Sequence, residues 1–253
     1  MSTESGGGGR EGATPLVIGH RGASAAHPEN TLVAFAGAAA LGADWVELDV
    51  RRTADGELVV HHDATLPDGR VIVETSSGDL PPTVAALAAA LAVCAAHDLG
   101  VNIEIKSDPT EPDFDDTYVV AERVAETLAA MPATRSDGSA RYLVTSFDPG
   151  CVAQVREVAP ALPTGQLAFD LRDPAALIAA AAAAGHVAVN PWAPFVDAAF
   201  VAAARAAGLR VYPWTVDDPD HLRVLIGLRV DGIITNVPDV LRSLLQTGDR
   251  QTL

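Results

Sequence analysis

The chain has 253 residues, of which 49% are apolar, and this is enough to form one sizeable hydrophobic core. Its formal net charge of −16 argues against nucleic acid or an anionic membrane as a partner, because both need a basic face. No apolar run approaches the roughly 20 residues that a membrane-spanning helix requires. We therefore expect no membrane insertion.

The first segment, residues 1–14, is rich in Ser and Gly and has no cationic stretch followed by an apolar one. We expect a disordered tail without a secretion signal, followed by one domain over residues 15–253. Cys94 and Cys151 lie among apolar residues without metal-ligand spacing, as buried free thiols do. These features favour a cytoplasmic protein, and they leave its oligomeric state open.

From residue 15 onward, a short apolar run, a polar tip and an Ala-rich amphipathic segment recur in this order about eight times. Most of the apolar runs are rich in Val and Ile, which is typical of buried parallel strands. In chain order they are PLVIG, WVELDV, VNIEIK, YLVTSF, GQLAF, HVAVN, LRVYPWTV and DGIITN.

The segments between these runs have helical patterns. We predict helices over residues 30–41, 84–97, 118–130, 174–184, 197–207 and 218–228. Helix start signals stand at Asn30-Thr31, Asp148-Pro149 and Asp173-Pro174. Four glycines follow helices, where a left-handed cap is favoured: Gly42, Gly100, Gly185 and Gly208.

Strict alternation of strands and helices implies a parallel sheet. Eight units fit a closed (β/α)8 TIM barrel better than an open doubly wound sheet, and the chain has no G-x-G-x-x-G motif. One irregularity follows the second strand. Residues 58–62 and 71–73 predict a short extended excursion there.

Carboxylates mark the strand ends at which such a barrel builds its active site. Glu47 and Asp49 are two residues apart on the second strand and share a face, and Glu104 lies on the third. Three carboxylates in one dry site raise one another's pKa, and a hard divalent cation such as Mg²⁺ or Ca²⁺ resolves this repulsion. Alternatively, each carboxylate is solvated or paired with Arg51 or Lys106.

Two histidines and two basic residues accompany the carboxylates. His20 ends the first strand and His62 lies in the excursion, and imidazole can act as acid or base near neutral pH. Strand alternation puts His61 and His62 on opposite faces, so we expect only one of them in the site; His61 stays ambiguous, and we take His62 as the candidate. Arg21 and Lys106 offer positive charge to phosphate oxygens, although Arg21 could instead pair with a site carboxylate. This set of groups suits phosphoryl chemistry.

Later strands contribute less charged candidates. The sixth strand ends in Asn190, which we take as a supporting residue, and the seventh contains Trp214. Together with Trp192 and Phe195, Trp214 offers an apolar wall for the organic part of a substrate. We therefore assign Trp214 to substrate binding.

Several of these segments resemble the glycerophosphodiester phosphodiesterase family. HRGASAAHPENTLVAF (His20–Phe35) is similar to its opening signature, and VELDVRRTADGELVVHHDATL (Val46–Leu66) to its second block. NIEIK, VTSFDP, VYPWTVDD and DGIITNVP follow in the order found in that family. The resemblance covers nearly the whole chain after the tail. It implies a (β/α)8 barrel, a divalent metal ion, and hydrolysis of a small-molecule glycerophosphodiester to glycerol phosphate and an alcohol.

The resemblance also implies roles for individual residues, and it adds Glu29 as a residue that helps to organise the site. The implied roles are acid and base for His20 and His62, metal ligands for Glu47, Asp49 and Glu104, and phosphate contacts for Arg21 and Lys106. The family's route is internal attack by a glycerol hydroxyl through a cyclic phosphate. The residues do not distinguish this route from direct attack by water.

The chain departs from the family pattern in two places. Asn236 follows Thr235 where the family commonly has Asp, so that carboxylate's task is met differently here. Many members also have a Leu-x-Arg-Thr-Thr segment and an inserted region where this chain has only PDGRVIVETSSGDLPP. Because that region shapes the substrate pocket, headgroup preference stays open.

Two other functions compete with this interpretation. A barrel related to lysophospholipase D or sphingomyelinase D would need an apolar rim or membrane-facing patch, and only 5% of the residues are aromatic. A non-catalytic barrel that binds a phosphorylated ligand should have lost a histidine or a carboxylate from the set. None is missing.

Overall fold

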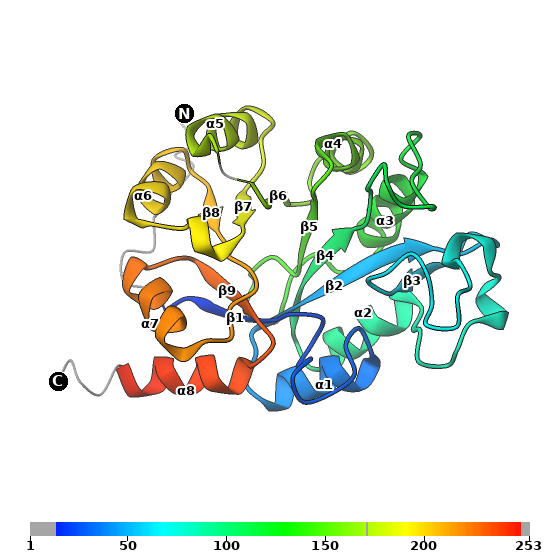
Figure 1. Ribbon diagram of the computed structural model, residues 1–253, viewed down its shortest axis with the longest axis horizontal. Helices are drawn as coiled ribbons and strands as arrows, with labels where there is room; N and C mark the ends of the chain where they lie inside the picture. Colours follow the sequence, from blue (N-terminus) through cyan, green and yellow to red (C-terminus); the bar gives the residue numbers. More distant parts are fainter. Residues whose placement is uncertain (1–13, 171, 249–253) are drawn as a thin grey trace.

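The computed structural model describes residues 14–170 and 172–248, and in this part a ring of parallel strands is surrounded by helices (Figure 1). The tail expected over residues 1–14 therefore lies outside the described residues, apart from Thr14. The ring has the strand order β8-β7-β6-β5-β4-β2-β1-β9. Its strands are β1 (Leu16–Gly19), β2 (Trp45–Arg52), β4 (Gly100–Ile105), β5 (Tyr142–Ser146), β6 (Thr164–Ala168), β7 (Ala188–Pro191), β8 (Arg210–Val211) and β9 (Gly232–Thr235).

Backbone hydrogen bonds close the ring between β8 and β9. The regular part of β8 has two residues, because Pro213 has no N–H to donate to a ladder. The chain nevertheless continues beside β9: Asp231 N donates to Val211 O (3.1 Å) and Ile234 N to Pro213 O (3.0 Å). The predicted (β/α)8 barrel is confirmed.

The helices form an outer layer around this ring (Figure 1). They are α1 (Leu32–Ala40), α2 (Leu87–Ala96), α3 (Val119–Ala129), α4 (Pro149–Val158), α5 (Pro174–Ala183), α6 (Ala198–Ala206), α7 (Pro219–Leu228) and α8 (Pro238–Gly248). The side chains of Thr31, Asp148 and Asp173 accept backbone N–H groups in the first turns of α1, α4 and α5, as the sequence predicts.

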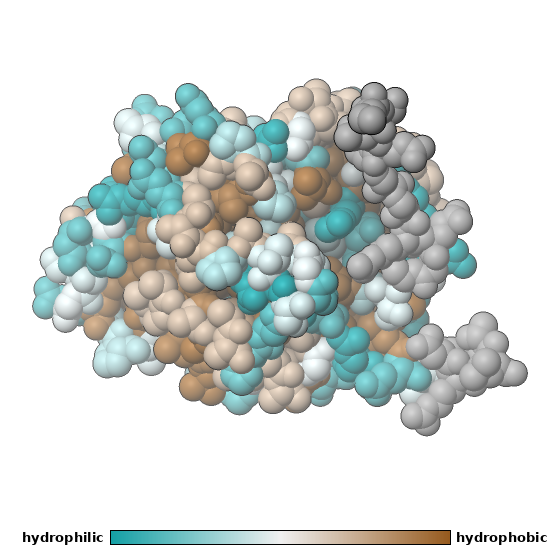
Figure 2. All heavy atoms as spheres, turned by 180° about the vertical axis from the view of Figure 1, so that it is seen from behind, coloured by the Kyte–Doolittle hydropathy of each residue, from teal (hydrophilic) through white to brown (hydrophobic). Residues whose placement is uncertain are grey.

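The surface of this layer mixes apolar and polar residues, as Ala-rich helices would produce (Figure 2). None of the helices in the described part of the chain is long and apolar enough to cross a membrane. Cys94 and Cys151 are buried and free. Burial raises the pKa of both thiols to about 12, so they remain protonated at neutral pH.

The excursion after β2 contains one strand and two short 3₁₀ helices. β3 (Leu58–Val60) pairs antiparallel with β2, which confirms the first extended segment. Residues 72–73 are not extended as expected, because they lie in η1 (Ile72–Glu74), and η2 (Ser77–Asp79) follows. The turn of η1 buries Ile72 against Val59 and Leu66 in a small separate core, which an extended chain would not do.

A layer of apolar side chains fills the barrel interior below the carboxylates. Its members point inward two residues before the residues at the mouth, as Trp45 does before Glu47 on β2. The layer comprises Ile18, Trp45, Leu143, Ala188, Tyr212 and Ile234. Trp45 needs the space beside Gly100 on β4, because a Cβ at Gly100 would lie 2.1 Å from Trp45 Cε2. Gly100 is therefore not the left-handed cap that we expected after α2. Asp98 takes that conformation, with φ 52°.

This packing predicts that Gly100→Ala destabilises the fold. An added methyl against a rigid indole should lower the free energy of unfolding by about 1–3 kcal/mol. Urea unfolding measures the change, with an unchanged m value showing that stability alone is affected. Gly78→Ala is the matched control, since nothing lies within 4 Å of a Cβ there. Equal stability of the two variants would contradict this account of the barrel interior.

Candidate active site

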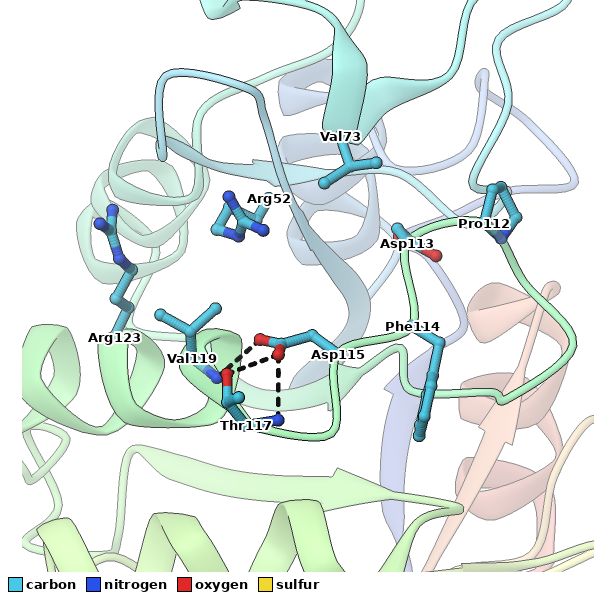
Figure 3. A pocket seen from close by; sticks show the side chains of 9 residues that line it. All are labelled: Arg52, Val73, Pro112, Asp113, Phe114, Asp115, Thr117, Val119 and Arg123. Atoms are coloured by element: carbon cyan, nitrogen blue, oxygen red, sulfur yellow. Dashed lines mark hydrogen bonds between the residues drawn. The ribbon is translucent and has the colours of Figure 1, made fainter.

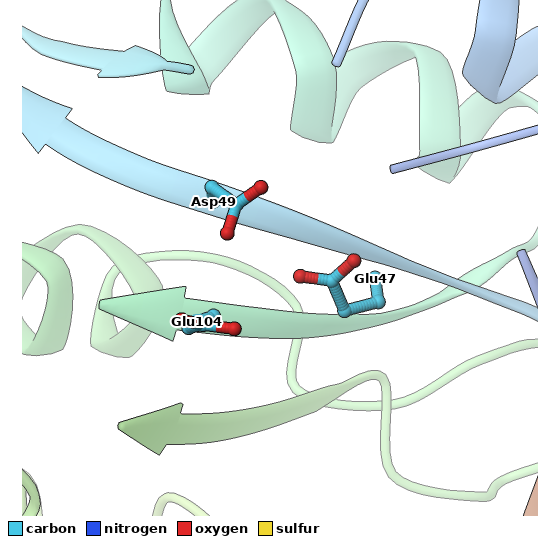
Figure 4. A group of neighbouring side chains, drawn as sticks. All are labelled: Glu47, Asp49 and Glu104. Atoms are coloured by element: carbon cyan, nitrogen blue, oxygen red, sulfur yellow. The ribbon is translucent and has the colours of Figure 1, made fainter. Parts of the chain in front are cut away.

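Three carboxylates meet at the C-terminal end of the barrel (Figure 4). Glu47 and Asp49 project from β2, and Glu104 projects from the neighbouring β4, where the register pairs it with Asp49. One oxygen from each lies within 4.8 Å of the others. Glu47 and Asp49 are only 3% and 1% exposed, so water cannot screen this negative charge.

The pKa values of these groups express their mutual repulsion. Burial and the charge of Asp49 raise the pKa of Glu47 well above its usual range, and the same two causes raise that of Glu104. Burial also acts on Asp49, but the positive charges of Lys106 and Arg21 outweigh it and lower the pKa. Glu47 Oε1 is buried and has no hydrogen-bond partner. An orphaned carboxylate oxygen within an acidic cluster fits a hard divalent cation.

Arg21 and Lys106 lie against this cluster. Lys106 Nζ is 2.8 Å from Glu104 Oε1 and 3.7 Å from Asp49 Oδ1. Arg21 Nε is 3.3 Å from Asp49 Oδ2, and its Nη1 is 2.9 Å from Glu29 Oε1. The pairing of site carboxylates with Lys106 and Arg21 is therefore present, and Glu29 orients Arg21 at the mouth.

His20 stands beside the cluster at the end of β1. Its Nδ1 is 2.7 Å from Asn236 Oδ1, and its Nε2 is 3.9 Å from Glu47 Oε2. Asn236 Nδ2 donates to Asp217 Oδ2, which leaves Asn236 Oδ1 as an acceptor and assigns the proton to His20 Nδ1. Burial and the charge of Arg21 lower the pKa of His20, although the Asn236 hydrogen bond opposes them. His20 therefore presents an unprotonated Nε2 toward the carboxylates.

His62 lies in the segment that follows β3. Its Nδ1 is 2.6 Å from Asp63 Oδ1, and this hydrogen bond lowers the pKa of Asp63. This segment runs beside the carboxylates, because His61 N donates to the backbone oxygen of Asp49 (3.0 Å). His61 instead directs its Nδ1 to the backbone oxygen of Asp63, 2.9 Å away.

Asn30 supports Asp49 and was missed as a site residue. Its Nδ2 donates to Asp49 Oδ2 (2.8 Å), and Asp49 N donates to Asn30 Oδ1 (3.3 Å). Asn30 is 3% exposed and has a left-handed backbone, with φ 57°. The sequence suggested a helix start here, but Thr31 alone caps α1. The overlooked signal was Asn30 itself, a polar residue directly after Glu29 in the segment His20–Phe35 that resembles the family's opening signature.

Aromatic side chains form the opposite side of the mouth. This aromatic wall follows the ends of β5 to β8 and comprises Phe147, Phe169, Trp192, Phe195 and Trp214. The rings of Phe169 and Trp192 are stacked at 4.7 Å, and the ring centroids of Phe147 and Trp214 are 5.5 Å apart. The sequence identified three of the five. Phe147 and Phe169 could also have been found from the sequence. Each stands two residues after an inward-facing strand residue, Thr145 or Leu167, and residues two apart point to the same side.

The aromatic wall adjoins the basic groups. Glu104 pairs with Thr145 in the register of β4 and β5, so two residues further along Lys106 and Phe147 lie at the same level. Asn190 lies beneath the wall and is fully buried, and its backbone oxygen accepts from Trp214 Nε1 (2.8 Å). Neither polar atom of its side chain has a hydrogen-bond partner. Asn190 thus belongs to the aromatic side of the barrel rather than to the carboxylates.

A hollow of about 440 Å³, which we call the outer hollow, lies outside the mouth (Figure 3). It is bounded by the end of β2, by η1 and by the loop before α3, and its polar lining includes Arg52, Asp113 and Arg123. None of the predicted catalytic, metal or phosphate residues lines it. We therefore keep the candidate active site at the barrel mouth.

The comparisons with known proteins agree with this geometry. The model of the glycerophosphoryl diester phosphodiesterase family matches residues 20–240. A glycerophosphodiester phosphodiesterase of Caldanaerobacter subterraneus subsp. tengcongensis is 31% identical, over 92% of this chain and 98% of its own. A Silicibacter pomeroyi structure of the same family is 30% identical, with a TM-score of 0.80 over 94% of this chain and 95% of that one. An Oleispira antarctica phosphodiesterase, solved with its product sn-glycerol-3-phosphate, shares the fold at 23% identity and a TM-score of 0.79, covering 92% of this chain and 97% of that one. This chain belongs to the glycerophosphoryl diester phosphodiesterase family.

Proposed function

We propose that this protein hydrolyses small glycerophosphodiesters to glycerol phosphate and an alcohol, with a divalent cation held by Glu47, Asp49 and Glu104. The observation that carries the proposal is the buried carboxylate cluster, whose repulsion calls for a cation at the mouth of a barrel of this family. Oxygen ligands of this kind suit Mg²⁺ or Ca²⁺. The free thiols suit a reducing compartment, and we place the enzyme in the cytoplasm.

The phosphate group is bound between the carboxylates and the two basic side chains. A bound cation supplies Lewis-acid stabilisation of charge on the phosphoryl oxygens. Arg21 and Lys106 add fixed positive charge at the same place, so the substrate anion can approach a protein whose net charge is −16. When phosphate oxygens arrive, they compete with Asp49 and Glu104 for these two side chains.

The two histidines move the protons of the reaction. Each has its Nδ1 hydrogen-bonded to an acceptor, Asn236 for His20 and Asp63 for His62, so Nε2 is the atom that exchanges a proton. One imidazole takes the proton of the attacking hydroxyl, and the other gives a proton to the departing alcohol oxygen. Glu29 supports this arrangement by holding Arg21.

The aromatic wall takes the organic part of the substrate. Trp214 contacts Phe147 and is fixed through its Nε1 to Asn190 O, so it offers a rigid face to a glycerol unit or a small headgroup. Phe169 is 56% exposed and Phe195 is 44% exposed at this rim. This exposed rim is also the one observation that favours a lysophospholipase D-like activity as the second candidate.

Metal dependence is the first test of the proposal. Chelation should abolish activity, and Mg²⁺ or Ca²⁺ should restore it, because the cation offsets the repulsion of the cluster. Calorimetry should detect binding of the metal alone to the chelated protein. Glu47→Gln should lose that binding, whereas Glu157→Gln on the exposed side of α4 should keep it. Full activity of the metal-free protein would disprove the assignment.

Proton transfer gives the second test. His20→Ala and His62→Ala should each lower kcat by roughly 100-fold or more, the usual contribution of positioned acid–base groups. His61→Ala should have a mild effect, and His97→Ala, on the exposed end of α2, should have none. If His61 proved essential and His62 dispensable, the choice of His62 as the catalytic histidine of this segment would be wrong by one residue.

Substrate size gives the third test. Water-soluble glycerophosphodiesters should be cleaved at least about ten times more efficiently than lysophospholipids, which corresponds to about 1.4 kcal/mol in the transition state. The aromatic wall covers one side of the mouth only, and an acyl chain gains just ~0.8 kcal/mol per buried methylene, so it needs cover along its whole length. The measurement is kcat/KM for both substrate types, with the lipid below its micellar threshold. A preference for the lipid would favour the lysophospholipase D-like activity and leave the metal site unaffected.

A further inference from the structure

Arg51 is a buried cation that the proposed reaction does not use. It lies on β2 two residues after Asp49, and its side chain is fully buried. The guanidinium donates to the backbone oxygen of His62 twice, from Nε at 2.8 Å and from Nη2 at 2.5 Å. The guanidinium thus binds a backbone carbonyl here, rather than a metal-site carboxylate, the alternative that the sequence left open.

The other side of the guanidinium reaches a distant part of the chain. Nη1 is 2.6 Å from Asp113 Oδ2, and Nη2 is 2.8 Å from Glu111 Oε2. Both acceptors belong to the loop between β4 and α3, and Asp113 also lines the outer hollow (Figure 3). A buried cation thus links the carbonyl of His62 to a loop about 50 residues further along the chain.

The Arg51 link holds the His62 peptide just beyond the point where pairing with β2 ends, since the preceding residue is held by a hydrogen bond from His61 N to Asp49 O (3.0 Å). β3 ends at Val60, so His62 lies beyond the ladder with β2, and its side chain is 34% exposed. The hydrogen bond of its ring goes to the adjacent Asp63, whose side chain is 73% exposed. Two N–H groups of one planar guanidinium, directed at the same carbonyl, fix both the position and the direction of the His62 peptide.

We infer that Arg51 is a positioning residue, which holds His62 at the barrel mouth and couples it to the loop before α3. The inference rests on the proposed role of His62 in proton transfer. The hydrogen bonds and ion pairs of Arg51 go to His62 O, Glu111 and Asp113 rather than to the carboxylates that would hold the cation. Its effect passes through the peptide of His62, so its loss should affect turnover more than substrate binding.

The variant Arg51→Gln tests this role. It should lower kcat by roughly 10- to 100-fold, as a displaced catalytic group does, while KM changes by less than about three-fold. Arg52→Gln is the matched control, because Arg52 is the next residue on β2 but faces the outer hollow. In NMR spectra of the histidine side chains, the signals of His62 should shift or broaden in Arg51→Gln, whereas those of His20 should not.

Removal of a buried cation can unfold a protein by leaving its partners unpaired. The triple variant Arg51→Met, Glu111→Gln, Asp113→Asn removes the charge together with its partners, and it should show the same loss of kcat at near-normal Tm. A folded triple variant with normal kcat and unchanged His62 signals would overturn the inference.

The double variant Arg51→Gln, His62→Ala separates this inference from the proposed function. If Arg51 acts through His62, adding Arg51→Gln to His62→Ala should lower kcat by less than about two-fold. A full further loss would mean that Arg51 acts elsewhere, and would overturn its positioning role. If His62→Ala alone retained normal activity, the proposed role of His62 would fail, and the role of Arg51 with it.

Discussion

Repulsion among three carboxylates in a dry space is the constraint on which the rest of the site depends. Glu47, Asp49 and Glu104 are brought together by the register of β2 and β4, and burial removes most of the solvent that would screen their charges. Several neighbouring polar groups reduce this repulsion. Asn30 donates to Asp49, and Lys106 and Arg21 bring positive charge. Glu47 Oε1 has no hydrogen-bond partner, so its negative charge is not fully offset by these neighbours.

The contacts of His20 account for the departure at Asn236. A carboxylate at this position would place a negative charge directly on the imidazole. In this chain the carboxylate is Asp217, one hydrogen bond further away, and the neutral amide of Asn236 lies between them. His20 is thereby held in one tautomer without a charged neighbour on its Nδ1 side. Ser24 Oγ donates to the same amide oxygen, which fixes it further.

Local patterns were sufficient to predict the barrel, the helix starts and the carboxylate cluster. Each depends on spacing that the sequence shows directly, such as the two-residue spacing of Glu47 and Asp49. The contacts of Arg51 with Glu111 and Asp113 could not be predicted, because residues about 60 apart meet only through the course of an irregular loop. Gly100 was misassigned for a similar reason, since Trp45 lies on another strand.

The two sides of the mouth come from different parts of the chain. The carboxylates and basic residues lie between His20 and Lys106, and the aromatic wall lies between Phe147 and Trp214. Under the proposed function, point changes in the aromatic segments would therefore alter which alcohol is accepted without touching the carboxylates assigned to the cation. A barrel with this layout can diversify its substrates during evolution through one half of its sequence while the chemistry in the other half is kept. The same division offers protein engineers a natural boundary for exchanging headgroup specificity between relatives.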